Sequence, residues 1–492
     1  MTDQARAERS LTATPKASVA NQRSARRAEE DDEDVTPKGE TPARERVLAL
    51  LKRFGWNATS FQILEPGFHY WFDADDACIG YVDTGRAWVA APPVAAPERF
   101  AAVMDRFIAA ATEAGRRVCC FAAEERFVAA TGWPALQVGD QPVWQPAAWN
   151  GILDHTKSLR EQLRRGRAKG VAVREVPAEE LVPGHPTRAR LDALIVRWLA
   201  TRPMAPMGFL VQVEPFEFPA ERRMFVAEHA GEVVGLLGVI PMYARRGWFF
   251  EDFLRDPTAP NGTVELLVDA GMRAAVAAGI EHVTFGMVPL AGDVSPVLRA
   301  VRRAGRALYD FDGLRAFKAK FRPTGWDRIY LAYPHGESSI LAVLDTLTAF
   351  SRGGLLQFGV KTALRGPAIV VRLLAVLLVG WTVMLALPTS APWFPSPAWQ
   401  YGWVAFDVVL AVALISLSIR WRPRLAEAVT IAVTCDALLT AVEALAYNAP
   451  RSQRALDVCI LLIAVMAPTV AAILLWNARA HRLSSSAAPS RS

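Results

Sequence analysis

The sequence predicts a mixed α/β (α+β) globular region followed by an α-helical transmembrane domain of about four spans. Up to residue 335, short apolar stretches of strand length alternate with stretches whose apolar residues recur at helical spacing. Beyond residue 365, four apolar stretches of about 17 to 23 residues follow one another. Each is long enough to cross ~30 Å of hydrocarbon at about 1.5 Å per residue. With 492 residues, the chain has room for two or three domains with full cores.

The composition favours a protein that meets anionic partners in a reducing compartment. Apolar residues make up 52% of the chain, and 55 basic against 49 acidic residues leave a net charge of +6. This excess suits nucleic-acid phosphates or anionic lipid head groups, although ordinary solubility accounts for it equally well. No nucleotide phosphate loop or cluster of metal ligands is visible in the sequence, so no cofactor and no metal are expected. Five cysteines without metal-ligand spacing are predicted to be reduced packing residues: Cys78, Cys119, Cys120, Cys435 and Cys459.

The N-terminal part is predicted to be a disordered leader, residues 1–43, followed by a first domain, residues 44–150. The leader is polar and has no secretory apolar region, so it cannot bury enough surface to order itself. The first domain shows no catalytic constellation. Its expected elements are helices at 44–54 and 100–114, strands around Ile63 and at 78–82, 88–91 and 118–122, and turns at 132–134 and 139–142.

The most basic stretch, residues 157–169, reads KSLREQLRRGRAK and is expected to be a helix. Arg160, Arg164 and Arg167 are spaced four and three residues apart, so they share one helix face. Leu159 and Leu163 form a neighbouring stripe that can dock on the body of the protein. Guanidinium groups bind phosphate oxygens in bidentate fashion, so this face is a candidate site for tRNA or lipid phosphates; a solvated basic helix is the alternative.

The second domain, residues 151–335, is expected to hold a strand, a polar loop and a helix in succession near residue 250. The strand covers 248–254, Pro257 and Pro260 break it, and apolar residues at helical spacing begin at Val264. A helix start after a strand offers free backbone N–H groups, which can hold an anion or an acyl oxygen. Further expected elements are helices at 191–200 and 293–304, a hairpin of strands 224–228 and 233–240, and strands at 282–285 and 330–333.

Several short motifs in this region occur in the order found in a known family. They are Asp252-x-x-Arg255, Pro260-x-Gly262-x-x-Glu265, Gly313-Leu314, Phe317-Lys318-x-Lys320-Phe321-x-Pro323, and Trp326 to Tyr330. The chain from about residue 45 to 335 thereby resembles the catalytic domain of phosphatidylglycerol lysyltransferases, the aminoacyl-lipid synthases of the multiple peptide resistance type. The resemblance implies two tandem acetyltransferase-like (GNAT-like) domains. It also implies transfer of an amino acid from aminoacyl-tRNA to a lipid hydroxyl, with phosphatidylglycerol as the usual acceptor.

The same motifs supply the candidate catalytic residues Asp252, Arg255 and Glu265. Asp252 can bind the α-ammonium group of the donor or act as a base, and Arg255 can hold a phosphate or the developing oxyanion. Glu265 can assist the base or stabilise the helix dipole. Asp252 and Arg255 point to opposite faces of an ideal strand, so they converge only if the strand ends or bulges near Leu254.

The candidate substrate-binding residues of this domain are Gly262, Lys318 and Lys320. Gly262 stands at the helix start, where backbone N–H groups are free. Lys318 and Lys320 can contact the tRNA terminus or a lipid phosphate, or form a solvated strand edge. With no serine or cysteine in a nucleophile elbow, direct transfer without a covalent enzyme intermediate is preferred.

The C-terminal part is predicted to be a linker, residues 336–364, a membrane domain, 365–480, and a tail, 481–492. The expected spans are 367–387, 402–418, 425–447 and 455–476. In familiar members of the family the membrane spans precede the catalytic domain, whereas here they follow it. Asp436 and Glu443 share a face of the third span, where carboxylates are costly, so they are either functional or packed internally.

Basic residues outside the spans indicate the orientation of the membrane domain. Most of them lie on the side that holds both ends, at positions 361, 365, 420, 422, 424, 479 and 482, whereas only Arg451 and Arg454 lie on the other side. By the positive-inside rule, both ends and the catalytic domain are cytoplasmic, in a bacterial inner membrane.

Two other hypotheses stay open. The first is a GNAT-like acyltransferase that uses acyl-CoA, although residues 255–262 lack the usual coenzyme A loop pattern. The second is a membrane-anchored binding module without activity. A lipid modification that requires intact tRNA would separate the leading hypothesis from both.

Overall fold

The computed structural model describes residues 40–202, 208–211, 213–305, 310–351, 358, 367–419, 422–451 and 455–486. The predicted leader up to residue 39, most of the predicted linker and the end of the tail therefore lie outside the described residues. Helix α2 (Glu40–Phe54) begins four residues before the helix predicted at 44.

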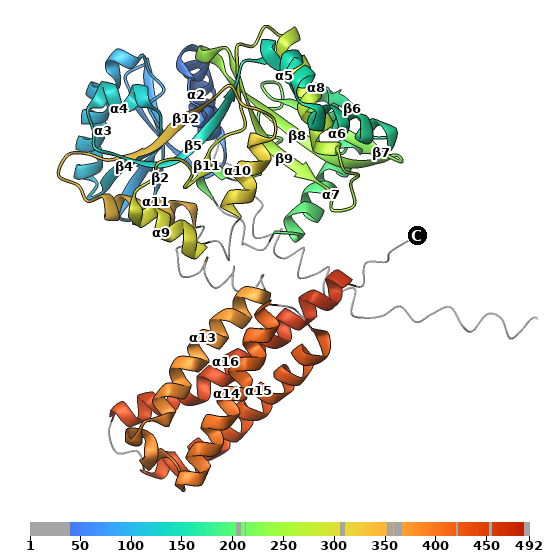
Figure 1. Ribbon diagram of the computed structural model, residues 1–492. Helices are drawn as coiled ribbons and strands as arrows, with labels where there is room; N and C mark the ends of the chain where they lie inside the picture. Colours follow the sequence, from blue (N-terminus) through green and yellow to red (C-terminus); the bar gives the residue numbers. More distant parts are fainter. Residues whose placement is uncertain are drawn as a thin grey trace, which may run out of the picture. The chain divides into compact units, whose positions relative to one another are not determined.

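A single twelve-stranded sheet runs through the globular region (Figure 1). Its order is β1-β2-β3-β4-β12-β5-β10-β9-β8-β7-β6, with β11 paired to β5. The strands are β1 (His69–Asp73), β2 (Ala77–Asp83), β3 (Ala87–Ala90), β4 (Arg117–Ala123), β5 (Ala135–Trp144), β6 (Ala172–Val176), β7 (Arg223–His229), β8 (Glu232–Met242), β9 (Gly247–Arg255), β10 (His282–Thr284), β11 (Val288–Pro289) and β12 (Gly325–Ala332).

The two halves of the sheet repeat one order of elements. In the first half, β1, β2 and β3 are antiparallel neighbours, and helix α3 (Phe100–Glu113) leads to β4, which is parallel to β3. In the second half, β7, β8 and β9 are antiparallel neighbours, and helix α8 (Thr263–Ala277) leads to β10, which is parallel to β9. Strand β12 lies between β4 and β5, so the last strand of the region completes the first half. The sheet is therefore continuous across residue 150.

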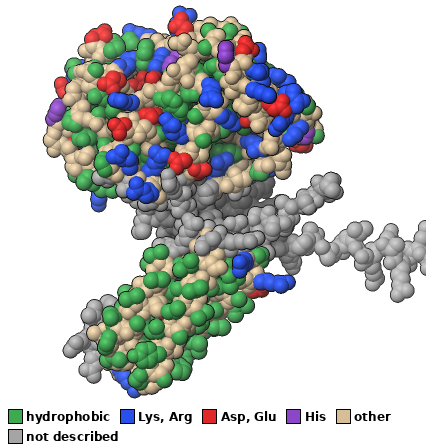
Figure 2. Space-filling model, in the orientation of Figure 1, with side chains coloured by type: hydrophobic (Ala, Val, Ile, Leu, Met, Phe, Trp, Pro, Cys, Tyr) green, Lys and Arg blue, Asp and Glu red, His purple; other side chains and the backbone are tan. Residues whose placement is uncertain are grey.

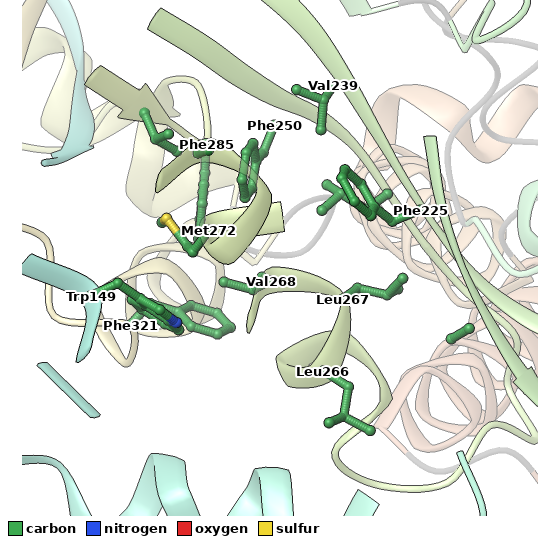
Figure 3. Packing of buried hydrophobic residues seen from close by; sticks show 14 of the residues in the cluster. Trp149, Phe225, Val239, Phe250, Leu266, Leu267, Val268, Met272, Phe285 and Phe321 are labelled. Carbon is green, nitrogen blue, oxygen red and sulfur yellow. The ribbon is translucent and has the colours of Figure 1, made fainter. Parts of the chain in front are cut away.

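Helices cover the sheet and complete the cores. They are α4 (Glu125–Thr131), α5 (Trp149–His155), α6 (Lys157–Ala168), α7 (Pro186–Ala200), α9 (Pro296–Gly305), α10 (Phe311–Ala319) and α11 (Ser339–Phe350). In Figure 3, Met272 of α8 lies near Phe250 and Phe285, and Leu267 of α8 lies on the side of Phe225, all within one buried cluster. On the other face of β9, Leu254 packs with Leu191 and Leu194 of α7. β9 is therefore buried on both faces, with α8 on one and α7 on the other.

Three local expectations in the globular region are wrong. The predicted strand around Ile63 is a 3₁₀ helix, η1 (Ala58–Leu64), because its apolar run packs without alternating faces. The predicted turn at 139–142 is the middle of β5, which pairs with β12 on one side and with β10 and β11 on the other. Lys318 and Lys320 lie on and just after helix α10, not on a strand edge. Tertiary pairing overrides the turn preference of glycine and proline at the second of these positions.

The C-terminal region forms four helices near the positions predicted for the spans. They are α13 (Pro367–Ala386), α14 (Pro397–Ile419), α15 (Pro423–Glu443) and α16 (Ala455–Ser486). By length and composition, 397–418 and 423–451 can cross a membrane, whereas the described apolar stretches of the other two, 374–386 and 461–476, are shorter. Large apolar side chains are exposed along all four helices, and on the face seen in Figure 2 the bundle surface is mainly hydrophobic.

Three of the predicted packing cysteines are buried free thiols, Cys78, Cys119 and Cys120, as expected. Cys435 is also a free thiol but is exposed on α15, so its prediction as a packing residue is wrong for the bundle by itself. The side chain of Cys459 lies outside the described residues.

Candidate functional site

The candidate site is organised around strand β9, whose edge is only partly paired. Strand β10 pairs with β9 over three residues, from Gly247 to Phe249. β9 continues to Arg255 in register with β8. Among the described residues, no strand pairs with the β10 side of β9 beyond Phe249. Backbone N–H and C=O groups along this edge are therefore available to a ligand.

A buried lysine binds the segment that directly follows β10. The Lys318 ammonium group donates hydrogen bonds to the carbonyl oxygens of Phe285, Gly286 and Met287, at 2.6, 2.8 and 3.1 Å. These carbonyls directly follow β10, and Gly286 has a positive φ of 73°. Burial lowers the pKa of Lys318 to about 7. The side chain that was expected to contact substrate phosphate is thus occupied in binding the segment that follows β10.

A β-bulge in β9 sets the direction of its two carboxylates. Gly238 pairs with Asp252 and Val239 pairs with Phe250, so Glu251 is the extra residue. Phe250 and Phe253 pack in the core on the α8 side, and Leu254 packs on the α7 side. The two residues of a bulge that oppose one partner interrupt the alternation of faces. Glu251 and Asp252 can therefore lie on one face, although they are adjacent.

These carboxylates belong to a buried acidic cluster around Arg222, whose side chain is 2% exposed. The Arg222 guanidinium donates to Glu251 at 2.6 Å and lies 3.4 Å from a carboxylate oxygen of Glu65. Gln62 donates to the second oxygen of Glu251 at 2.6 Å. The other oxygen of Glu65, Oε2, is buried without a hydrogen-bond partner. Two carboxyl groups thus contact one fixed positive charge, and the third, Asp252, interacts with that charge electrostatically.

Burial and mutual repulsion raise the pKa values of two carboxyl groups in the cluster. Burial, followed by the Glu251 carboxylate, raises the pKa of Asp252 to about 8. Burial and the same neighbour raise the pKa of Glu65 well above its usual range. The Arg222 charge opposes both shifts but does not cancel them. Such a site attracts a cation, because a bound positive charge would stabilise every ionised carboxylate in it.

Arg255 lies on the other face of β9, where the sequence analysis had required a bulge near Leu254 to bring it to Asp252. The bulge precedes Asp252 instead, and β9 is regular from there to Arg255. The Arg255 guanidinium donates to the Ala259 carbonyl at 2.5 Å and lies 3.5 Å from the Asn261 side-chain oxygen. Asp252 and Arg255 are therefore not brought into contact.

The remaining candidates gather near the start of α8. Lys320 pairs with Glu265 in the first turn of α8 at 2.8 Å. Gly262 precedes this turn with a φ of 100° and touches α6: a Cβ there would lie 2.5 Å from the Gln162 carbonyl oxygen. Helix α6 thus covers the residue at which the sequence analysis expected a free helix start.

The three arginines of α6 have different partners. Arg160 donates to the carbonyls of Leu153 and Asp154 at the end of α5. Arg167 pairs with buried Asp269 of α8 at 2.9 Å. Arg164 pairs only within its helix, with Glu161, and its side chain is 69% exposed. The inner stripe of Leu159 and Leu163 is buried, as predicted. Two of the three guanidinium groups therefore help to fix α6, and Arg164 faces solvent.

Four residues of the cluster were not predicted from the sequence as site residues: Gln62, Glu65, Arg222 and Glu251. The first two belong to the N-terminal half, in which no catalytic constellation was visible. Gln62 reaches Glu251 of β9 across 189 residues of sequence, and Glu65 reaches Arg222 across 157. The only local signal was a glutamate directly after the apolar run FQIL. A buried charge at the end of an apolar segment requires a partner, but the sequence does not name it.

Comparison with known proteins identifies the family of the globular region. The profile of the family described as phosphatidylglycerol lysyltransferase, C-terminal, matches residues 48–333. The phosphatidylglycerol lysyltransferase of Bacillus subtilis is 36% identical over 117 residues, 22% of this chain and 13% of that protein. The lysylphosphatidylglycerol biosynthesis bifunctional protein LysX of Gordonia bronchialis is 25% identical over 285 residues, 52% of this chain and 24% of that protein. The chain thus spans less than a quarter of the length of these relatives.

Two solved structures share the fold of the globular region. One is the C-terminal domain of an Agrobacterium fabrum protein assigned as a lysylphosphatidylglycerol synthetase, with a TM-score of 0.55 and 26% identity over 64% of this chain and 99% of that one. The other is L-PGS from Bacillus licheniformis, with a TM-score of 0.54 and 21% identity over 62% of this chain and 96% of that one. The expected mixed α/β, GNAT-like fold is confirmed. Because the family profile covers more than half of the chain, the protein belongs to the phosphatidylglycerol lysyltransferase C-terminal family.

Proposed function

We propose that this protein is a membrane-bound aminoacyltransferase that moves an amino acid from aminoacyl-tRNA to a lipid hydroxyl, with phosphatidylglycerol as the acceptor. Family membership and the names of its relatives support the reaction class. The observation that carries the proposal is the buried cluster of Glu65, Glu251 and Asp252 around Arg222, at the level where β9 loses its partner strand. An aminoacyl ester presents an ammonium group directly beside its reactive carbonyl, and this site offers negative charge next to free backbone groups.

The reaction exchanges one ester for another. The lipid hydroxyl oxygen attacks the carbonyl carbon of the aminoacyl ester, and the bond to the terminal ribose oxygen of the tRNA breaks. The proton of the lipid hydroxyl passes to a base and then to the ribose oxygen, so no oxidant or further reactant is needed. Because the donor ester is already activated, the protein has to orient the reactants, polarise the carbonyl and move one proton.

Different carboxyl groups of the acidic cluster bind the donor and transfer the proton. The unpartnered Oε2 of Glu65 and the carboxylate of Glu251 receive the α-ammonium group, which replaces the hydrogen bonds that Glu65 lacks. Asp252, with a pKa of about 8, takes the proton of the acceptor hydroxyl. A base whose pKa lies near the operating pH transfers protons efficiently in both directions. The bound ammonium group favours the ionised form of Asp252, so donor binding prepares the base.

The opposite face of β9 receives negative charge. The backbone N–H groups of the unpaired edge can stabilise the carbonyl oxygen as it becomes an oxyanion, and Arg255, on the face away from the acidic cluster, can hold a substrate phosphate. Lys320 is fixed by Glu265 beside the start of α8 and is a further contact for phosphate. Lys318 fixes the segment that follows β10 and is therefore a positioning residue for the neighbouring edge of β9.

The exposed basic side of α6 is the proposed contact for the tRNA backbone. Arg164 faces solvent, whereas Arg160 and Arg167 anchor the helix and contribute their charge. The four C-terminal helices form the proposed four-span anchor in the bacterial inner membrane, with the catalytic domain in the cytoplasm, where charged tRNA is found.

The first test is a mass spectrometric comparison of lipids from cells that express the wild-type protein or Asp252→Ala. A lipid heavier than phosphatidylglycerol by one aminoacyl residue, present with the wild type and absent with Asp252→Ala and Arg255→Ala, is expected. Glu175→Gln is the matched control, because Glu175 is an exposed residue of β6 that pairs with Arg223 of β7 and not with a carboxylate-binding residue of the cluster. An unchanged lipid profile with both Asp252→Ala and Arg255→Ala, each present in the membrane, would contradict the site.

Kinetics with purified protein separate the two carboxylate roles. Glu65→Gln should raise the KM for aminoacyl-tRNA, because it weakens ammonium binding, whereas Asp252→Asn should lower kcat at least 100-fold. Treatment of the donor with RNase should abolish transfer by the wild type. Transfer that survives RNase and requires acyl-CoA would favour the alternative acyltransferase reaction.

A further inference from the structure

The C-terminal bundle encloses a cavity of about 880 Å³, lined by residues from all four helices and from the segment that links α13 to α14. This volume is within the range of small-molecule sites in proteins. Most lining side chains are aliphatic, and three indole rings add aromatic surface: Trp381, Trp393 and Trp403. An apolar ligand body fits such walls.

Three carboxyl groups line the same cavity: Asp407 of α14, and Asp436 and Glu443 of α15. Asp407 is 4% exposed, and its Oδ2 has no hydrogen-bond partner. The indoles of Trp399 and Trp403 donate to the two oxygens of Glu443, at 3.1 and 3.0 Å. No lysine, arginine or histidine is found among the described residues that line the cavity. The polar part of the cavity is therefore acidic and incompletely satisfied.

An acidic cavity inside apolar helices requires compensation. Carboxylates in a membrane interior are costly unless a cation or a hydrogen-bond donor meets them. The described residues contain no group of three ligands placed to share a metal ion. An organic ammonium group fits both the carboxylates and the indole rings of the cavity. It can donate hydrogen bonds to Asp407 and Asp436, and its positive charge is also attracted to the faces of indole rings.

We propose that this cavity binds a lipid whose head group carries a primary ammonium group. The apolar walls receive the lipid body, and the carboxylates of Asp407, Asp436 and Glu443 receive the ammonium group. An aminoacylated phosphatidylglycerol and a phosphatidylethanolamine share this chemistry, so either can supply the ligand. The inference rests on the lining of the bundle and does not depend on the proposed transfer activity.

The test uses full-length protein that carries Asp252→Ala and Glu65→Gln, so that the acidic cluster of β9 does not turn over the probe and binds its ammonium group less well. The protein is reconstituted in nanodiscs of phosphatidylcholine with a small fraction of lysyl-phosphatidylglycerol, phosphatidylethanolamine or phosphatidylglycerol. Lipid retained after extraction is quantified by native mass spectrometry. The two ammonium lipids should be retained at least tenfold over phosphatidylglycerol, and the stronger of the two identifies the source.

Matched variants connect retention to the cavity. Asp407→Asn and Glu443→Gln should each reduce the retention of ammonium lipids about tenfold. Glu427→Gln should leave it unchanged, because Glu427 lies on α15 but pairs with Arg479 and does not line the cavity. Equal retention of phosphatidylglycerol and the ammonium lipids, or full retention by folded Asp407→Asn, would overturn the proposal.

A second measurement needs no variant in the bundle. Lipids with brominated chains quench nearby indoles, so a brominated phosphatidylethanolamine should quench the tryptophan fluorescence of the protein. Dodecylamine should reverse this quenching, whereas dodecanol of the same chain length should not. Reversal by both compounds to the same extent would show that the cavity selects only apolar bulk and would contradict the assignment.

The two proposals fail separately. Retention of ammonium lipids together with unchanged lipids in cells would contradict only the transferase. A new aminoacylated lipid in cells together with no head-group preference in nanodiscs would contradict only the cavity ligand.

Discussion

At the scale of single residues, burial decides which charges are reactive and which are structural. Asp252 and Lys318 are both buried, and burial shifts the pKa of each toward neutrality. Their surroundings differ, however. Asp252 faces other carboxyl groups, whereas Lys318 donates to three carbonyl oxygens that have no negative charge to neutralise. The first arrangement attracts a cationic ligand, and the second ties two segments together.

The raised pKa of Asp252 predicts a pH dependence of stability with a defined sign. Between the usual value of 3.8 and about 8, the folded protein keeps a proton that the unfolded chain has lost. Rising pH therefore costs the wild type up to about 1.4 kcal/mol per unit in this window, and Asp252→Asn escapes the cost. In thermal unfolding of the full-length protein, Asp252→Asn should gain in melting temperature relative to the wild type from pH 5 to pH 8.5.

Asp256 supplies a control of opposite sign. Burial acts to raise its pKa, but hydrogen bonds from Thr258 and the ion pair with Arg197 outweigh this and lower it. Asp256→Asn should therefore destabilise the protein near neutrality and lose this effect as the pH falls below about 4. Parallel pH profiles for the two variants would refute the assigned environments.

Lys318→Met should destabilise the globular region by about 3 kcal/mol, because it leaves three buried carbonyl oxygens without a donor. Lys320→Met is the matched control two residues away. Its ion pair with Glu265 is partly exposed, so its loss should cost about 0 to 1 kcal/mol. Denaturant unfolding of both variants measures the difference, and similar losses in the two would argue against the role assigned to Lys318.

At the scale of elements, the contact between α6 and α8 positions the start of α8 beside β9. The two helices meet at Gly166 and Gly262, where a Cβ on Gly262 would lie 3.0 Å from the Gly166 backbone. The ion pair of Arg167 with Asp269 fixes the same pair of helices further along. Trp149 of α5 also donates to Asp269, at 2.9 Å. The basic helix is therefore attached to the helix that follows the catalytic strand.

Gly262→Ala should test this contact. Its φ of 100° disfavours any side chain by about 1 to 2 kcal/mol, and the clash with the Gln162 carbonyl adds about 1 to 3 kcal/mol. Gly279→Ala shares the positive φ, at 67°, but a Cβ there meets nothing within 4 Å. Thermal unfolding should show a clearly larger loss for Gly262→Ala. Equal losses would mean that α6 does not constrain the start of α8.

At the scale of the whole molecule, the distribution of basic residues around the C-terminal helices predicts on which side of a membrane each part lies. The segment between α13 and α14 carries no charged residue, whereas Arg422 directly precedes α15 and Arg424 lies in its first turn. With the globular region before α13, the positive-inside rule predicts that this region lies on the cytoplasmic side.

Cysteine labelling in intact cells should verify this orientation. In a background of Cys435→Ala and Cys459→Ala, Ala391→Cys lies between α13 and α14 and should react with a membrane-impermeant thiol reagent added outside. Ser338→Cys, an exposed position before α11, should react only after the cells are permeabilised. The native thiols Cys78, Cys119 and Cys120 are buried and should stay silent in both conditions. The reverse labelling pattern would require the opposite topology.

Local periodicity was sufficient for most of the elements. Strands β2, β3, β4, β7, β8 and β9 and helices α3, α6 and α7 lie close to where their patterns predict them, because alternation and helical spacing record which face is buried. The four C-terminal helices follow from uninterrupted apolar length. The failures at η1 and in the middle of β5 occur where a short segment takes its conformation from distant partners, β5 from β12 more than 180 residues away.

The sequence by itself determined the elements, the family motif around Asp252 and Arg255, and the separation of a charged globular region from an apolar C-terminal one. The tertiary structure decided the composition of the site. It brought Gln62, Glu65 and Arg222 together beside Glu251, the neighbour of Asp252 in β9. It also kept Arg255 on the opposite face and buried Lys318 against the carbonyl oxygens that follow β10. Periodicity reports only whether a side chain is buried. Which charges share that interior depends on strand order and on a bulge in β9, and these are fixed by pairings between distant parts of the chain.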